Sequence, residues 1–154
     1  YNACVNSARY VAERTGAPVA LTLQGLSAFP TAHPLYVGML GMHGNYGPNL
    51  LTNEADLIIA VGMRFDDRVT GNLAKYAPDA KVVHIDIDRA EIGKNVRATV
   101  GIVSDARAAL EELLPLVEQR EFPAWLERFR ECDAVEYERV IRHELHPEDG
   151  RLKM

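Results

Sequence analysis

The sequence lacks any long hydrophobic run. The longest runs, such as residues 57–62, have about six residues, whereas a membrane-spanning helix needs about 20. Cysteine is scarce, since Cys4 and Cys132 are the only two and lie far apart. We therefore expect neither a disulfide framework nor a zinc site, and the scarcity of cysteine fits a cytoplasmic protein. Excess basic charge is also missing, because the formal net charge is -5; binding to nucleic acid or to an anionic membrane is not expected.

Several well-known motifs are missing as well. The sequence has no G-x-G-x-x-G, and the run Gly41-Met42-His43-Gly44 does not match it. A G-x-x-x-x-G-K-[ST] loop is absent too, so neither an ordinary NAD domain nor a nucleoside-triphosphatase loop is supported. There is no G-x-S-x-G, no H-E-x-x-H and no cysteine with a nearby histidine. We therefore expect no catalytic residue and no metal site in this sequence, and the polar residues that it has indicate binding.

What is present is typical of a packed domain followed by a charged segment. Of the 154 residues, 47% are hydrophobic and 25% are charged, which excludes a disordered chain. Charged residues make up 22 of residues 1–115 but 17 of residues 116–154. We predict an α/β domain at 1–115 and a helical arm at 116–154. Because the first residue is not Met, we also expect the sequence to be a piece of a longer protein, truncated at its N-terminal side.

The hydrophobic pattern predicts alternating helices and strands. Apolar runs predict four strands, at 19–23, 57–61, 81–87 and 99–103. Helices are predicted at 6–15, 49–54 and about 106–114, with one helical turn after Asp88. Residues 24–47 are predicted to be irregular and 63–71 to be a polar loop. Strands separated by helices favour parallel pairing, so the fold class is α/β, with a doubly wound, Rossmann-like parallel sheet.

Such sheets bind ligands beyond the carboxyl ends of their strands. Gly62 would let a ligand approach the backbone, and Arg64 could bind phosphate oxygens; a turn glycine with a surface arginine is an equally open interpretation. Asp86 could accept bonds from ribose hydroxyls or cap a helix, whereas capping alone explains Asp105. His43, between two glycines, is the histidine that we expect to contact a ligand.

Four segments together resemble one family closely. They are LGMHG at 40–44, GMRFDDRVTG at 62–71, HIDID at 84–88 and AEIGKN at 90–95. Each is similar to the corresponding segment of the large, catalytic subunit of acetolactate synthase (acetohydroxyacid synthase), a thiamine-diphosphate enzyme of branched-chain amino-acid biosynthesis. The resemblance covers residues 16–114, and RFDDRVTG followed by HIDID is its most specific part. Residues 122–146 match the family poorly.

The resemblance implies the middle of three α/β domains, which in this family binds FAD in a largely structural role. It implies that the flavin site includes residues from the predicted strand ends and from the irregular stretch: Thr22, Leu23, Leu40, Gly41, Met42, His43, Gly62, Met63, Arg64, Phe65, Asp66, Asp67, Arg68, Asp86, Ile87, Asp105 and Ala106. It further implies that Met42, His43, Asp67 and Arg68 face the substrate channel. The family has a glycine-rich turn at the start of this domain, and we expect it to be missing here.

The resemblance also implies the activity of the whole protein, a transferase of the carboligase type. The protein would join two pyruvates, or pyruvate and 2-oxobutanoate, using thiamine diphosphate and Mg²⁺ held by the two outer domains. A homodimer or homotetramer with a regulatory small subunit is implied, and the isolated segment is expected to be inactive. Three alternatives stay open: the central domain of glyoxylate carboligase or pyruvate oxidase, a stand-alone nucleotide-binding module, and a sirtuin-like deacylase. The last lacks the expected glycine-rich start and zinc cysteines.

Overall fold

The fold alternates helices and parallel strands. A computed structural model describes the main chain of residues 2–144 and the side chains of residues 4–144. The strands are β1 (Val19–Leu21), β2 (Tyr36–Met39), β3 (Leu57–Val61), β4 (Lys81–Asp86) and β5 (Val100–Val103). The helices are α1 (Asn2–Thr15), α2 (Tyr46–Leu51), α3 (Asp67–Thr70), α4 (Ala106–Leu113), α5 (Pro123–Glu136) and α6 (Arg142–Glu144). A π-helical stretch at Tyr137–Ile141 joins α5 to α6. The part of the predicted arm at 145–154 lies outside the described residues.

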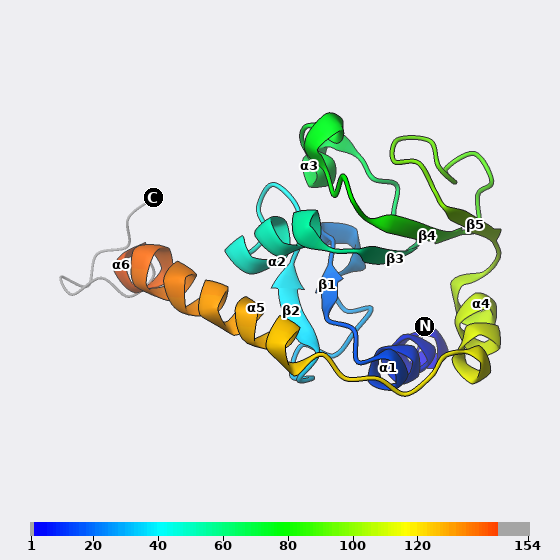
Figure 1. Cartoon of the computed structure of the whole chain (residues 1–154), viewed down its shortest axis with the longest axis horizontal. Helices are drawn as coiled ribbons and strands as arrows, with labels where there is room; N and C mark the ends of the chain where they lie inside the picture. Colours follow the sequence, from blue (N-terminus) through cyan, green and yellow to red (C-terminus); the bar gives the residue numbers. More distant parts are fainter. Residues whose placement is uncertain (1, 145–154) are drawn as a thin grey trace.

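All strand pairs are parallel, as the sequence predicts, and they form two sheets (Figure 1). β1 pairs with β2 in the first sheet. In the second sheet β4 lies between β3 and β5, with His84 opposite both Ala60 and Gly101. β4 is the most buried strand, and Ile85 and His84 on it have no exposed surface. The α/β class with parallel strands is therefore confirmed.

Helices α1 and α4 pack against each other (Figure 1). Asp105 caps α4, as predicted, because its carboxylate accepts hydrogen bonds from the N–H groups of Arg107 and Ala108. The segment that leaves α4 then crosses the C-terminal end of α1. There Arg120 N–H donates to the Arg14 carbonyl at 3.0 Å, and the main chain of Arg120 leaves no space for a side chain at Gly16. These contacts fix the start of the arm.

Helix α5 extends from the domain on one side (Figure 1) but is not a fully solvated arm. Its residues Phe129 and Cys132 are buried in one apolar cluster with Val37 of β2 and Leu51 of α2. Burial is the main reason that the pKa of the Cys132 thiol is raised above its ordinary value. The high charge content of this segment therefore belongs to its other faces.

The structure departs from the sequence-based predictions at three places. Residues 24–47 are not wholly irregular, since they include β2, which has four residues with Gly38 among them. The predicted turn after Asp88 does not form a regular helix, since residues 89–95 are turns and bends. Glu91 N–H nevertheless donates to the Asp88 carbonyl, and the Asp88 carboxylate accepts from Ala90 N–H, as at the start of a helix. The polar loop after β3 includes the short helix α3. Among the described residues, no helix has the length and apolar content needed to cross a bilayer.

Candidate functional site

The candidate site residues follow the carboxyl ends of all five strands. Thr22 and Leu23 come after β1, and residues 40–43 come after β2. Residues 62–68 follow β3, Asp86 ends β4, and Asp105 with Ala106 follows β5. Because parallel strands place their carboxyl ends at the same edge of a sheet, each sheet presents its candidates at one edge.

The turn after β2 contacts the segment after β3. Met42 N–H donates to the Arg68 carbonyl at 2.7 Å, and Leu40 N–H donates to the Leu21 carbonyl at 2.8 Å. The structure therefore brings together the two segments that carry the predicted channel residues, 42–43 and 67–68. Met42 is 60% exposed at this place, and His43 and Arg68 are exposed as well.

Asn49 of α2 holds the same turn. Its Oδ1 accepts from Gly41 N–H at 2.9 Å, and its Nδ2 donates to the Gly41 carbonyl at 2.8 Å. Gly41 has φ +115°, and a Cβ there would lie 3.1 Å from the Arg68 carbonyl oxygen. Glycine is therefore required both by the backbone conformation and by the close approach of the neighbouring segment. Sequence analysis did not find Asn49, because an asparagine inside a predicted short helix carries no such signal.

The loop after β3 has an unusual backbone. Gly62 and Phe65 have φ +61° and φ +52°, a region that residues other than glycine seldom adopt. The Phe65 side chain is only 2% exposed and packs edge-on against the rings of His84 and Tyr76. Phe65 thus fixes the loop to the core, and its ring does not face solvent.

The core behind this loop contains a buried hydroxyl group. Tyr76 is 7% exposed, and its hydroxyl has no hydrogen-bond partner among the described residues. Burial raises the pKa of Tyr76 to about 12, because the phenolate anion would lose its hydration. Tyr76 is therefore a neutral part of the core cluster that also contains Phe65 and Val82.

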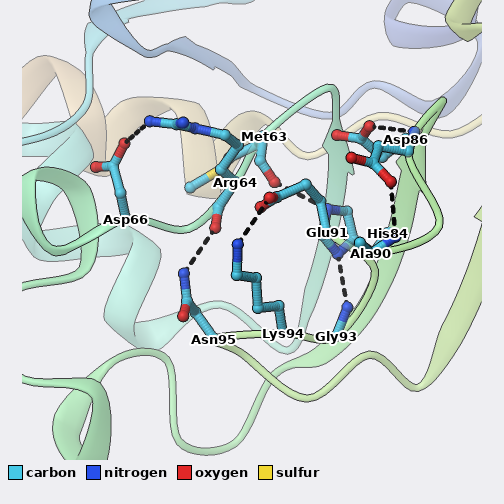
Figure 2. Close-up of polar contacts among 11 residues, drawn as sticks. Met63, Arg64, Asp66, His84, Asp86, Ala90, Glu91, Gly93, Lys94 and Asn95 are labelled. Carbon is cyan, nitrogen blue, oxygen red and sulfur yellow. Dashed lines mark hydrogen bonds and ion pairs between the residues drawn. The ribbon is translucent and has the colours of Figure 1, made fainter.

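Arg64 extends from this loop into solvent. Its side chain is 68% exposed and lies 3.4 Å from Asp66 Oδ2, an exposed ion pair of little stability. The main chain of the same segment is bonded twice: the Met63 carbonyl accepts from His84 Nε2, and the Arg64 carbonyl accepts from Asn95 Nδ2 (Figure 2). The guanidinium group is thus available to a ligand while its backbone is held.

The two candidate acids each have one carboxylate oxygen engaged locally. Asp86 Oδ1 accepts from Asp88 N–H at 2.8 Å, and Asp105 Oδ1 accepts the two α4 capping bonds. No bond from another described residue reaches Oδ2 of either acid. Next to Asp86, Ile87 is 75% exposed. Asp105 and Ile87 are exposed and thus open to a ligand, whereas Asp86 is only 9% exposed.

The candidate site residues are not all in direct contact with one another. Within the described part of the chain, no hydrogen bond or ion pair links any two of His43, Arg64 and Asp86. Two surface hollows lie elsewhere, one between α1 and α4 and one at the start of α5. No group of three or more potential metal ligands occurs among the described residues. The candidate site is thus an open edge formed by strand ends.

Comparison with known proteins places this fold in a family. A sequence model of the family described as "Thiamine pyrophosphate enzyme, central domain" matches residues 1–113. The chain belongs to this family. The central position in such enzymes and the α/β fold that the resemblance implies are therefore confirmed.

The relatives include acetolactate synthases and their large subunits. The chain is 50% identical over 124 residues to a probable acetolactate synthase large subunit of Methanocaldococcus jannaschii, covering 79% of the chain and 21% of the relative. It is 48% identical over 128 residues to the isozyme 3 large subunit of Escherichia coli K12, covering 83% and 22%, and 49% identical over 129 residues to acetolactate synthase 1 of Nicotiana tabacum, covering 80% and 19%. The chain thus spans about a fifth of the length of these relatives, and its predicted resemblance to acetolactate synthase is confirmed.

Proposed function

We propose that the chain acts as the central domain of an acetolactate synthase. The whole protein would join two pyruvates, or pyruvate and 2-oxobutanoate, with loss of carbon dioxide. The observation that carries this proposal is the identity of 46–50% to acetolactate synthases and acetolactate synthase large subunits of archaea, bacteria and plants. Residues 1–115 would form the domain proper and residues 116–154 the connection toward the third domain.

FAD is the ligand that we propose for the strand ends, and the residues present fit it. FAD contains a diphosphate and a ribose. Arg64 offers an exposed guanidinium group for the diphosphate. Gly62 would have open space around a Cβ, with nothing within 4 Å, so a ligand can approach its backbone. Asp86 and Asp105 each keep one carboxylate oxygen for hydroxyl groups, as acids at strand ends do in other dinucleotide sites.

The turn after β2 and the segment after β3 would form one wall of the substrate channel. Both Arg68 and His43 are exposed there, and Met42 adds an apolar surface. A 2-oxo acid has a carboxylate and a short apolar part, so an exposed guanidinium group and an exposed methionine on two bonded segments suit it chemically. In this proposal Met42, His43, Asp67 and Arg68 orient the substrate and exclude water, and they transfer no proton.

Thiamine diphosphate supplies the chemistry that breaks and forms the carbon–carbon bonds when it is bound, and we propose that it is held with Mg²⁺ by the two other domains. We further propose a homodimer or homotetramer, a regulatory small subunit as partner, and a cytoplasmic location in a bacterial-type cell. These proposals rest on what the relatives are called and on the family as a whole.

Two measurements test the proposal. The full-length protein that contains this chain is purified and assayed with pyruvate, thiamine diphosphate, Mg²⁺ and FAD. Acetolactate formation is expected, and the absence of turnover with any 2-oxo acid would contradict the proposed activity. The 154-residue chain alone is assayed in parallel, and we expect no acetolactate from it; turnover by the chain alone would show that catalytic groups lie within it.

A further inference from the structure

His84 is fully buried in β4, yet both of its ring nitrogens are hydrogen-bonded to main-chain groups of other segments. Nε2 lies 2.8 Å from the Met63 carbonyl oxygen, and Nδ1 lies 3.2 Å from the Gly93 amide nitrogen. A carbonyl only accepts and an amide N–H only donates. Nε2 therefore carries the hydrogen and Nδ1 is the acceptor, so the ring is neutral and in a single tautomer.

These two bonds tie together two loops that lie at neighbouring strand ends. Met63 directly precedes Arg64 in the loop after β3, and Gly93 belongs to the turns between β4 and β5. Figure 2 shows His84 between these two segments. From the same turns, Asn95 Nδ2 donates to the Arg64 carbonyl at 3.1 Å. Two successive carbonyls of the Arg64 segment are thus held by side chains that come from β4 and the turns after it.

The loop needs such restraint because its backbone is not a preferred one. Phe65, the residue after Arg64, has φ +52°, and a non-glycine residue in this region persists only where its surroundings impose it. The Arg64 side chain itself is restrained only by an exposed ion pair, which is weak. The two carbonyl bonds therefore fix the backbone position from which the guanidinium group extends.

We infer that His84 is a positioning residue for the ligand site: its Nε2–H bond to Met63 sets Arg64 at the strand-end edge to receive the diphosphate of a dinucleotide. The ring has no exposed surface, so it acts through Arg64 without touching the ligand. This inference rests on the proposed binding of FAD. It adds a residue outside the predicted site and gives Asn95 a secondary part in the same task.

Two amide variants of the full-length protein separate the two ring bonds. In His84→Gln the side-chain amide can still donate to Met63 from the place of Nε2, whereas in His84→Asn the shorter side chain can only accept from Gly93. Loss of a hydrogen bond of ordinary strength corresponds to about a tenfold change in affinity. We expect His84→Asn to raise the Kd for FAD at least about tenfold and His84→Gln to change it by less than about threefold.

FAD binding is measured by quenching of flavin fluorescence, and the melting temperature of each variant is measured without FAD. His33→Asn is the matched control, because His33 also has both ring nitrogens bonded, to Glu13 and to Leu35 N–H. His33 precedes the amino-terminal end of β2 and so lies away from the carboxyl ends of the strands. We expect His33→Asn to change the melting temperature but not the Kd. Equal Kd values for wild type, His84→Asn and His84→Gln would overturn the inference.

A double variant tests whether His84 acts through Arg64. If it does, His84→Asn adds no further loss of FAD affinity to Arg64→Ala. If the fold-changes in Kd of the two single variants multiply in the double variant, His84 acts by another route. Where His84→Asn does not fold, the exposed Asn95→Ala replaces it and is expected to weaken FAD binding severalfold, again only when Arg64 is present; an unchanged Kd would overturn the inference. Failure of the wild type to bind FAD would instead remove the proposed cofactor and this inference with it.

Discussion

The amide N–H of Met42 donates a 2.7 Å hydrogen bond to the carbonyl oxygen of Arg68. Met42 follows β2 of the first sheet, and Arg68 lies in α3 after β3 of the second sheet. This bond therefore connects the two sheets at the edge where the candidate site residues lie. Substitutions that loosen either segment should affect ligand binding and folding stability together.

Arg64→Ala is expected to weaken the binding of FAD to the full-length protein by about 1.5–3 kcal/mol, because a charged hydrogen bond to phosphate would be lost. Titration followed by flavin fluorescence measures the effect. Arg130→Ala is the control, since Arg130 is a similarly exposed arginine on α5, outside the proposed site, with one exposed ion pair to Glu127. An unchanged Kd for Arg64→Ala would remove Arg64 from the flavin site.

Asn49→Ala is expected to destabilise the chain by about 1–3 kcal/mol, because the buried N–H of Gly41 would lose its partner. The Gly41 carbonyl would keep only the bond from Gly44 N–H. Asn49→Asp should not rescue it, since a carboxylate oxygen would then face the Gly41 carbonyl. Urea unfolding measures both variants. Asn72→Ala serves for comparison: Asn72 is exposed and accepts only the N–H of Ala74, and a loss as large as that of Asn49→Ala would contradict a special role of Asn49.

Tyr76→Phe should leave the stability at neutral pH unchanged or slightly raised, because the hydroxyl that it removes is buried without a partner. The difference should grow in alkali. Because the pKa of Tyr76 is raised to about 12 in the folded chain, against about 10 in the unfolded chain, ionisation of the unfolded chain makes the wild type lose stability as the pH rises from about 10 to 12.

Melting temperatures at pH 8 and pH 11 test this expectation. The fall between these two values should be smaller for Tyr76→Phe than for the wild type. Tyr10→Phe, at a tyrosine that is 47% exposed, should reproduce the wild-type fall. If both variants behave alike, the Tyr76 hydroxyl is not held neutral by burial.

Glu136→Gln should loosen α5 and lower the pKa of Asp133. Glu136 Oε2 accepts hydrogen bonds from Tyr46 N–H and Asn45 Nδ2, so it fixes α5 to the start of α2. The pKa of the Asp133 carboxyl is raised first by burial and second by the negative charge of Glu136, and the variant removes the second cause. NMR titration of Asp133 measures the change. Glu138→Gln, which breaks only the exposed pair with Arg142, should leave that pKa as it is.

The strands that sequence analysis predicted best are those with long apolar runs. β3 has the predicted bounds, and β4 and β5 differ from theirs by one residue at one end. β2 was not predicted because its four residues include a glycine, which weakens any strand pattern. The Gly38 there has φ +112° and lies against Asn45, so its place in a strand depends on a tertiary contact that no local pattern contains.

The candidate site was predictable only where residue type alone suggests chemistry. Glycine, arginine and acids after strands indicated Gly62, Arg64 and Asp86. The residues that hold the site were not found, because Asn49 and Asn95 act through main-chain atoms of distant segments. His84 was not among the predicted site residues, and its two bonds became visible only with the fold.

The segment between α4 and α5 crosses the C-terminal end of α1. This crossing limits how the chain could be recombined with a relative. Arg120 N–H donates to the Arg14 carbonyl, and Gln119 Nε2 donates to the Glu13 carbonyl. Arg14 Nε in turn donates to the Val117 carbonyl. The connection thereby supplies the terminal cap that α1 would otherwise need. A chimaera that shortened residues 115–122 by even one position would leave those carbonyls without donors and shift α5 away from α2.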